Sequence, residues 1–387
     1  MSRQYLVLSG MLLILTGFFL LCSLFYGGLL SRFLRDWRAI PQPGPVPPAH
    51  ETALLPLVSV LVPARNEAAN IGVLLTALRA QQYPASRTEI IVIDDHSEDR
   101  TAAIVQAFSE VTLLRLQEDG IIAYKKKALE KGVALASGEL VLCTDADCIP
   151  GPHWVEQLVA AYQKRRAAFI AAPVLLQYRE NWLGYLQALD FMVLQGITGA
   201  GLQSGHLLMA NGANLAYPKM IFNKVNGYAG TDHIASGDDF FLLHKIADHY
   251  PERIVYLKSK QAIVTTAAQE TWGDFLQQRI RWASKSTHYK KGRLQAVLSL
   301  VWCYNVVLLL LALGGLLDSR SLFIFIGGWL IKTLLEWSFV SEVASFFDRK
   351  ALLKKFFWLQ PLHIVYTVVA GALGLKGNYR WKGRTVR

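Results

Sequence analysis

The chain has 387 residues, of which 52% are hydrophobic and 18% are charged, and its formal net charge is +11. Soluble domains carry about 25% charged residues, so the composition differs from that of a simple cytosolic protein. Three long apolar stretches contain no Asp, Glu, Lys or Arg, and each has at least the roughly 20 residues that cross a bilayer: Gln4–Ser31, Leu294–Leu317 and Phe356–Leu375. The charged block between the first two is large enough to bury its own core, which excludes a polytopic transporter.

Much of the basic surplus flanks these stretches. The flanking residues are Arg32, Arg35 and Arg38 after the first stretch, and Lys285, Lys290, Lys291 and Arg293 before the second. Basic residues at such positions attract anionic headgroups by about 1 kcal/mol each, so we expect anionic lipid headgroups, and no nucleic acid, as a partner. Only Arg3 precedes the first stretch. The positive-inside rule therefore predicts an integral protein of the cell (inner) membrane, with the following domain in the cytoplasm.

We expect a transmembrane helix at 4–31 and a basic, proline-rich linker at 32–56. Residues 57–270 then alternate apolar strand patterns with amphipathic helix patterns, which predicts an α/β domain with a doubly wound, mostly parallel sheet. Ligands of such sheets bind beyond the carboxyl ends of the strands. The predicted strands are Val58–Pro63, Glu89–Ile93, Val111–Leu116 and Glu139–Cys143, and the predicted helices are Ala69–Gln81, Asp99–Phe108, Lys126–Ala136 and Trp154–Gln163.

The region after residue 270 returns to the membrane. We expect an amphipathic interfacial helix at 271–293, membrane segments at 294–317, 321–347 and 356–375, and a basic tail at 376–387. The segment 321–347 holds Lys332 and Glu336 one helical turn apart, which either neutralise each other or line a polar passage. The segment 356–375 contains Pro361 and has basic residues on both sides. The sequence leaves open whether this segment crosses the membrane or is re-entrant.

Two aspartates end the fourth predicted strand. Asp145 and Asp147 are two residues apart in an extended chain, so their side chains project to one side. Magnesium is usually held by one or two carboxylates together with substrate phosphates, and the pair therefore predicts a Mg or Mn site. Cys143 and Cys148 flank the pair without a zinc-like spacing, and we expect both to be reduced bystanders.

Two adjacent aspartates, Asp94 and Asp95, end the second predicted strand. Ser97 and Asp99 follow them and fit caps of the next helix. Capping does not explain the adjacent carboxylates, which suit the N–H and hydroxyl donors of a nucleoside.

A run of three lysines, 125–127, opens a predicted helix, where cations oppose the helix dipole. The run is either a solvated face or a sign that a diphosphate lies nearby. In the second case, we expect Lys127 to bind it.

Two later clusters also combine reactive side chains. Asp238 and Asp239 follow a glycine at the start of a predicted helix, where Asp238 fits a cap. Gln278, Arg281 and Trp282 share one face of the interfacial helix, because they stand at i, i+3 and i+4. Core packing and headgroup contacts would explain this face, and so would contacts to an oxyanion and a sugar ring. The residues alone leave both interpretations open.

Together these motifs resemble glycosyltransferase family 2, the inverting GT-A type, over about residues 57–293. The helix that contains Lys127 is similar to the family pattern Lys-Ala-x-Ala-Leu-Asn-x-Gly, with Glu130 where Asn is usual, and Asp238 stands where the family has Glu. The matching segments are Arg65-Asn66-Glu67, Asp94-Asp95, Lys127–Gly132, Asp145-Ala146-Asp147, Asn211-Gly212-Ala213-Asn214, Asp238-Asp239 and the Q-x-x-R-W motif at Gln278–Trp282.

The resemblance implies a GT-A-like fold and an enzyme that moves a sugar from a nucleotide-diphosphate sugar, with UDP-sugars favoured. Asp239 would be the catalytic base, and Arg281 would neutralise the leaving diphosphate. Asp145 and Asp147 would hold the metal. The nucleotide-sugar site would contain Pro63, Arg65, Glu67, Asp94, Asp95, Lys127 and Asp145, and the acceptor side would contain Asn214, Asp238, Gln278 and Trp282.

The acceptor is the least determined feature. A synthase that extrudes its own polymer needs many spanning helices, and this chain has at most four apolar segments. We therefore expect transfer to a membrane lipid or lipid-linked acceptor. A processive polysaccharide synthase of the cellulose, chitin or hyaluronan type is the alternative. A non-catalytic, membrane-tethered nucleotide-sugar binding protein is a second alternative, and it predicts damaged metal or base positions, whereas both are intact.

Overall fold

The computed structural model describes residues 3–43, 55–284, 292–375, 379–381 and 384–386. Residues 44–54 of the predicted linker, residues 285–291 of the predicted interfacial helix with their three lysines, and parts of the predicted basic tail lie outside the described residues. The chain divides into two compact units. The first, here named the sheet unit, comprises Arg38–Gln177 and Ile197–Ala267; the second, named the helical unit, comprises Met1–Trp37, Tyr178–Gly196 and Ala268–Arg387.

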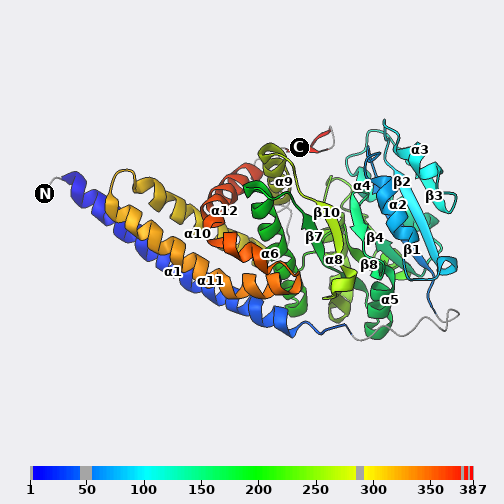
Figure 1. Cartoon of the computed structure of the whole chain (residues 1–387), viewed down its shortest axis with the longest axis horizontal. Coiled ribbons are helices and arrows are strands. Elements are labelled where there is room, and N and C mark those ends of the chain that lie inside the picture. Colours follow the sequence, from blue (N-terminus) through cyan, green and yellow to red (C-terminus); the bar gives the residue numbers. More distant parts are fainter. Residues whose placement is uncertain (1–2, 44–54, 285–291, 376–378, 382–383, 387) are drawn as a thin grey trace. The chain divides into compact units, whose positions relative to one another are not determined.

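A seven-stranded sheet with the order β3-β2-β1-β4-β8-β6-β9 forms the centre of the sheet unit (Figure 1). Strands β3, β2, β1 and β4 are parallel, and β8 pairs antiparallel with β4 and β6. The doubly wound, mostly parallel α/β sheet is thereby confirmed. The strands are β1 Val58–Ala64, β2 Thr88–Asp94, β3 Val111–Arg115, β4 Leu140–Cys143, β6 Phe169–Ala171, β8 Leu215–Pro218 and β9 Ile254–Tyr256.

A second sheet has the order β5-β10-β7, made of Cys148–Pro150, Val264–Ala267 and Val174–Gln177. Helices pack beside the large sheet through apolar faces and small residues. A Cβ added to Gly132 would lie 2.9 Å from the Ile93 side chain, so this glycine lets α4 approach β2 closely. The helices of the unit are α2 Ile71–Arg79, α3 Thr101–Gln106, α4 Tyr124–Leu135, α5 Trp154–Arg165, α7 Lys219–Lys224 and α8 Asp238–His249, with 3-10 turns η2 Ala85–Arg87, η3 Pro251–Arg253 and η4 Lys260–Ala262.

The helical unit contains four helices that are long and apolar enough to cross a membrane, within Ser9–Ala39, Gly292–Gly314, Ser319–Phe346 and Lys350–Gly374. They confirm the predicted N-terminal and C-terminal membrane helices. Helices α1 and α11 lie side by side (Figure 1), with the Phe33 and Phe339 rings 6.0 Å apart. The elements are α1 Arg3–Ala39, α6 Trp182–Ser204, α9 Trp272–Ser284, α10 Gly292–Gly314, α11 Ser319–Phe346, the turn η6 Lys350–Leu352, α12 Leu353–Gly374, and the strands β11 Tyr379–Trp381 and β12 Arg384–Val386.

Helix α6 lies within the catalytic domain predicted at 57–270, and its residues up to Gly196 group with the helical unit. The reason is a close approach to α11: a Cβ added to Gly196 would lie 2.5 Å from Val343 and 3.0 Å from Phe339. A glycine in the middle of a helix costs about 1 kcal/mol relative to alanine, and here it allows two helices to pack at short range.

The charged pair inside α11 is fully buried. Lys332 Nζ lies 2.7 Å from Glu336 Oε1 and 2.6 Å from the Gln360 side-chain oxygen on α12. The Tyr26 hydroxyl on α1 donates to the same glutamate oxygen at 2.5 Å. This geometry confirms that Lys332 and Glu336 neutralise each other, and it ties three apolar helices together through one polar cluster.

Candidate active site

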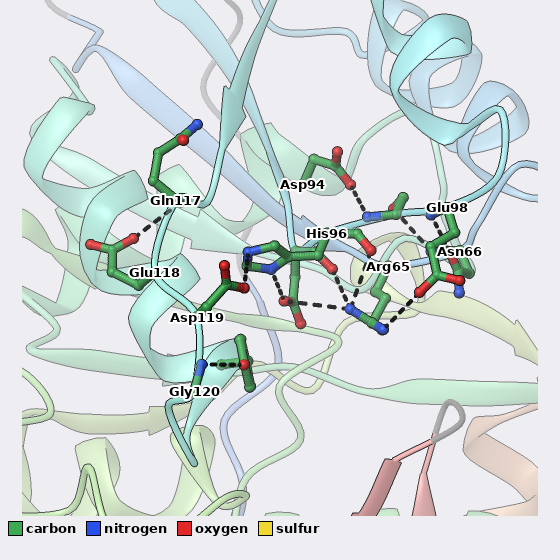
Figure 2. Close-up of polar contacts among 12 residues, drawn as sticks. Arg65, Asn66, Asp94, His96, Glu98, Gln117, Glu118, Asp119 and Gly120 are labelled. Carbon is green, nitrogen blue, oxygen red and sulfur yellow. Dashed lines mark hydrogen bonds and ion pairs between the residues drawn. The ribbon is translucent and has the colours of Figure 1, made fainter.

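The carboxyl ends of β1 and β2 carry an interlocked set of polar groups, drawn in Figure 2. Arg65 follows β1 directly, and its Nη1 donates to the backbone oxygens of Asp95 at 2.9 Å and of His96 at 3.2 Å. The Asp95 backbone N–H donates to the Ala64 oxygen at 2.8 Å. Since parallel strands end at the same edge of a sheet, these bonds hold the loops after β1 and β2 against each other.

Three predicted nucleotide-site carboxylates are buried in these loops: Glu67, Asp94 and Asp95 are 6%, 5% and 4% exposed. Glu67 Oε2 accepts a hydrogen bond from the Asn70 side chain at 2.7 Å. Asp94 Oδ1 accepts one from the Ser97 backbone N–H at 3.1 Å. A carboxylate has about four acceptor positions, so Asp94 can also accept from the N–H and hydroxyl groups of a nucleoside.

The helix-capping interpretation holds for Asp99. Its carboxylate accepts from the backbone N–H groups of Ala68 at 3.0 Å and of Thr101, the first residue of α3, at 2.9 Å. Desolvation raises the pKa of Asp99, but the hydrogen bonds from Thr101 and Ala68 outweigh it, so the pKa lies below its ordinary value. Ser97 serves the neighbouring loop instead, because its hydroxyl accepts from the Asn66 backbone N–H at 3.0 Å.

His96 is part of the same cluster, although no sequence motif pointed to it. Its Nδ1 lies 3.0 Å from Asp95 Oδ1, and its Nε2 lies 3.1 Å from Asp119 Oδ1 (Figure 2). The ring meets the Tyr124 ring edge-on, with centroids 5.7 Å apart. The imidazole therefore joins the loop after β2 to the loop before α4.

Lys125 on α4 connects the end of β4 with the start of α8. Its ammonium nitrogen lies 2.7 Å from Asp145 Oδ1 and 3.4 Å from Asp238 Oδ2. Desolvation of the buried ammonium lowers the pKa of Lys125, but the Asp145 and Asp238 carboxylates outweigh it, so the pKa is raised above its ordinary value. The predicted metal side and the predicted acceptor side thus share one cation.

The residues after β4 fit a divalent metal that substrate phosphates would complete. Among the described residues, no group of three or more His, Cys, Asp or Glu side chains could hold a metal on its own. Asp145 and Asp147 supply hard carboxylate oxygens, and Asp147 is exposed. Such a two-carboxylate set is typical of magnesium or manganese sites that also take phosphate oxygens.

Asp239, the predicted base, is held by two backbone N–H groups. Its Oδ2 accepts from Gly212 at 3.1 Å and its Oδ1 accepts from Phe240 at 2.7 Å. Gly212 lies at the centre of the cluster, because a Cβ added to it would be 3.1 Å from Asp238 Oδ2, 3.1 Å from Lys125 Nζ and 3.9 Å from the Asp239 Cβ. The structure therefore brings Asp145, Asp238 and Asp239 together around one glycine and one lysine.

Comparison with known proteins identifies this arrangement. Residues 59–225, which contain the β1, β2 and β4 loops, match the model of Glycosyl transferase family 2. Residues 59–225 are therefore similar in sequence to glycosyltransferase family 2.

Three curated relatives and one solved structure show how far the similarity extends. The probable glycosyltransferase YdaM of Bacillus subtilis is 29% identical over 237 residues, covering 59% of this chain and 55% of the relative. The poly-beta-1,6-N-acetyl-D-glucosamine synthase of Staphylococcus epidermidis is 25% identical, covering 58% and 53%. The beta-monoglucosyldiacylglycerol synthase of Synechocystis sp. is 31% identical, covering 36% and 32%. The chain thus spans between about a third and about a half of the length of these relatives.

The mannosyltransferase PcManGT from Pyrobaculum calidifontis, solved with GDP-Man and Mn2+, aligns with a TM-score of 0.58 at 18% identity. The alignment covers 94% of this chain and 99% of that chain. At this identity the likeness concerns the fold, which is GT-A-like.

The spacing of the glycosyltransferase family 2 pattern points to Lys125. In Lys-Ala-x-Ala-Leu-Asn-x-Gly the lysine stands seven residues before the glycine, and counting back from Gly132 reaches Lys125 rather than Lys127. Lys127 Nζ pairs with Glu130 at 2.9 Å on the half-exposed side of α4. Lys126 is 2% exposed and donates to the backbone oxygens of Thr231 at 2.7 Å and Ile234 at 2.9 Å. Nucleotide binding by Lys127 stays a prediction, and the spacing would have pointed to Lys125.

Asn214 is fully buried and its amide is satisfied within the protein. Its nitrogen donates to the backbone oxygens of Pro173 and Ala262, both at 2.8 Å, and its oxygen accepts from the Trp154 indole at 2.9 Å. The side chain thus links three segments of the sheet unit, and its place on the acceptor side stays a prediction. Pro63 is half-buried within β1, opposite Ile93 of β2.

The Q-x-x-R-W motif belongs to the helical unit. Gln278, Arg281 and Trp282 lie on α9 and are all of intermediate exposure, whereas Phe275 and Arg279 on the adjoining side of the helix are buried. The predicted common face is present in the structure. The contacts of the three motif residues with substrate stay a prediction.

Proposed function

We propose that this chain is a membrane-bound inverting glycosyltransferase that moves a sugar from a nucleotide-diphosphate sugar to a membrane lipid or lipid-linked acceptor. One observation carries the proposal: Lys125 contacts both Asp145 and Asp238, and the Gly212 N–H donates to Asp239, so the metal-side and base-side carboxylates lie close together. A sugar at this place would have its diphosphate toward Asp145 and its anomeric carbon toward Asp239.

Different side chains would bind the nucleoside, the metal and the diphosphate. The buried carboxylates after β1 and β2 would bind the nucleoside, since a base N–H and ribose hydroxyls donate hydrogen bonds that Asp94 can accept. Asp145 and Asp147 would hold Mg or Mn, which when bound supplies charge neutralisation for the diphosphate. Lys125 would add a second positive charge beside the same group.

Asp239 would act as the general base. Its carboxylate would take the proton of the acceptor hydroxyl as that oxygen bonds to the anomeric carbon, while the bond from this carbon to the diphosphate oxygen breaks. A single displacement inverts the anomeric configuration. General base catalysis of this kind typically contributes about 10²- to 10⁴-fold, and the two N–H groups on Asp239 hold its oxygens in a fixed direction.

A lipid acceptor is favoured by the four apolar helices and by one relative, the beta-monoglucosyldiacylglycerol synthase. Another is a polysaccharide synthase, which keeps processive synthesis as the alternative outcome of the test. We infer a UDP-sugar donor, a position in the cell (inner) membrane with the sheet unit in the cytoplasm, and anionic lipid headgroups as neighbours of the basic flanks.

The Q-x-x-R-W residues of α9 are the remaining candidates for substrate contacts. Arg281 would neutralise the leaving diphosphate, and Gln278 and Trp282 would contact the sugar or the acceptor. These residues lie on a rigid helix, which suits a role in orienting a substrate.

The test begins with the purified chain in lipid vesicles and a panel of UDP-, GDP- and dTDP-sugars, each with and without Mn²⁺ or Mg²⁺. We expect metal-dependent transfer of one sugar into the lipid fraction. We expect Asp239→Asn to leave nucleotide affinity within a few-fold and to abolish transfer. Near-normal turnover by Asp239→Asn would refute the base assignment, and a long polymer would refute single transfer to a lipid.

A further inference from the structure

We propose that Arg279, paired with Asp190, is a positioning residue that holds Gln278 and Trp282 of the Q-x-x-R-W motif in the orientation that sugar transfer requires. The inference rests on the proposed function, because it assumes that this motif contacts the substrate. Arg279 lies inside the motif at one of the two positions that the pattern leaves unspecified, so the pattern itself assigns it no role.

Arg279 and Asp190 form a buried ion pair between α9 and α6. The Arg279 Nη2 lies 2.6 Å from the Asp190 Oδ2, and the two side chains are 5% and 7% exposed. Burying two charges is costly, and attraction between them offsets this cost only with good geometry and further hydrogen bonds. A hydrophobic pair would serve packing equally well, so the charges suggest a role beyond stability.

Asp190 is itself fixed by α12. The Tyr366 hydroxyl donates to its Oδ1, and the His363 Nε2 lies 3.9 Å from the same oxygen. The His363 Nδ1 is 3.5 Å from Lys332 Nζ, which continues the polar cluster into α11. Helices α6, α9, α11 and α12 are therefore connected through one chain of charged and polar side chains, and Arg279 is its end on α9.

The other contacts of the Arg279 guanidinium go to residues of its own helix, and two of these belong to the motif. Its Nη1 donates to the Gln278 side-chain oxygen at 3.0 Å. Its centre lies 4.3 Å from the Trp282 ring centroid and 4.7 Å from that of Phe275. The Phe191 ring of α6 meets Trp282 from another element, 5.9 Å between centroids.

These contacts fix the orientation of the Gln278 amide and the Trp282 indole. Because the Gln278 oxygen accepts from Arg279, the amide is oriented with its NH₂ group as the remaining donor. A donor suits the hydroxyl or phosphate oxygens of a sugar nucleotide or acceptor. The planar guanidinium over Trp282 restrains the indole in the same way, by stacking. Arg279 thus connects Gln278 and Trp282 to Asp190. A lysine at this position could pair with Asp190, but it could not stack on Trp282 and donate to Gln278 at the same time.

A purely structural role predicts different behaviour. If the ion pair only joined α6 to α9, then Asp190→Leu combined with Arg279→Met would leave activity intact, because replacing both charges leaves no unpaired ion. If Arg279 positions the motif, the same double variant stays folded and loses turnover. A 1 Å misplacement of an orienting group can lower a rate by about 100-fold.

A second ion pair supplies the control. Arg179 Nη2 and Glu270 Oε1 lie 2.5 Å apart and join the segments just before α6 and α9, but both side chains are exposed, at 75% and 69%. Arg179→Gln combined with Glu270→Gln therefore removes a pair between the same parts of the chain without touching the motif, and we expect wild-type kinetics.

The experiment uses the full chain in lipid vesicles with UDP-glucose, UDP-N-acetylglucosamine and GDP-mannose as donor probes. We expect the double variant Asp190→Leu/Arg279→Met, and Arg279→Lys, to lower kcat by about 10- to 100-fold while the melting temperature and the affinity for the nucleotide with Mn²⁺ stay near the wild-type values. If the double variant does not fold, the kcat of Arg279→Lys alone tests the inference. Unchanged kcat in a folded variant overturns the inference while the proposed function stands. Absence of turnover by the wild-type chain with all three donors overturns the proposed function and this inference with it.

Discussion

Replacing Lys125 by methionine removes the cation that Asp145 and Asp238 share, and we expect a large loss of activity. The two carboxylate oxygens lie 2.7 Å and 3.4 Å from the same nitrogen. They are therefore at most about 6 Å apart, where two unit charges repel by about 3 kcal/mol at an effective dielectric constant of about 20. Asp145 is 35% exposed, so solvent screening reduces this value, and we use about 1–3 kcal/mol. The corresponding loss in kcat/KM is about 5- to 160-fold.

The assay compares Lys125→Met with Lys127→Met, two residues further along α4. Methionine keeps the length and the helix propensity of lysine, so both variants should fold, which melting curves check. Lys127 pairs with Glu130 on the half-exposed side of the helix, and we expect its replacement to change kcat/KM for the sugar nucleotide much less than that of Lys125. Equal kcat/KM for Lys125→Met and the wild type would refute the reasoning. A larger loss in Lys127→Met would instead support Lys127 as the lysine that binds the diphosphate.

Three further outcomes follow from the structure. Gly212→Ala places a Cβ 3.1 Å from both the Lys125 ammonium and the Asp238 Oδ2. Overpacking typically costs about 1–3 kcal/mol, and because these two groups have to shift apart we expect about a 5- to 160-fold loss of transfer rate, measured with the same donor. Lys332→Met should lower the free energy of unfolding by about 3–5 kcal/mol, because it leaves Glu336 buried without its cation. The double variant Lys332→Met/Glu336→Leu should recover most of this stability, and thermal unfolding in detergent measures both variants. Burial raises the pKa of the Cys143 thiol to about 12, so the reactive thiolate is nearly absent at pH 8, and mass spectrometry should find this cysteine alkylated by iodoacetamide only after unfolding.

Local patterns were enough to predict the elements of the sheet. The four predicted strands match β1 to β4 within one residue at each end. The reason is that a buried strand needs a short continuous apolar run, and such a run is visible without knowledge of its neighbours. The membrane helices were predictable for a similar reason, because a lipid environment requires about 20 apolar residues in sequence.

The strand ends also predicted where a ligand site should form. Glu67, Asp94 and Asp145 each follow or end an apolar run, and parallel strands bring their carboxyl ends to one edge. This topological rule turns positions far apart in the chain into neighbours. The resemblance to glycosyltransferase family 2 added Asp239, which lies outside the parallel strands.

Only the tertiary structure determined the roles of polar side chains whose function depends on which distant group they contact. All three lysines of the run 125–127 look alike in the sequence, but successive helical residues point about 100° apart, so Lys125 meets Asp145, Lys126 is buried and Lys127 pairs with Glu130. Asn214 became a core residue because three distant groups satisfy its amide. The pairing of Arg279 with Asp190 joins residues nearly ninety positions apart, and no local pattern encodes which of several charges will meet in a packed interior.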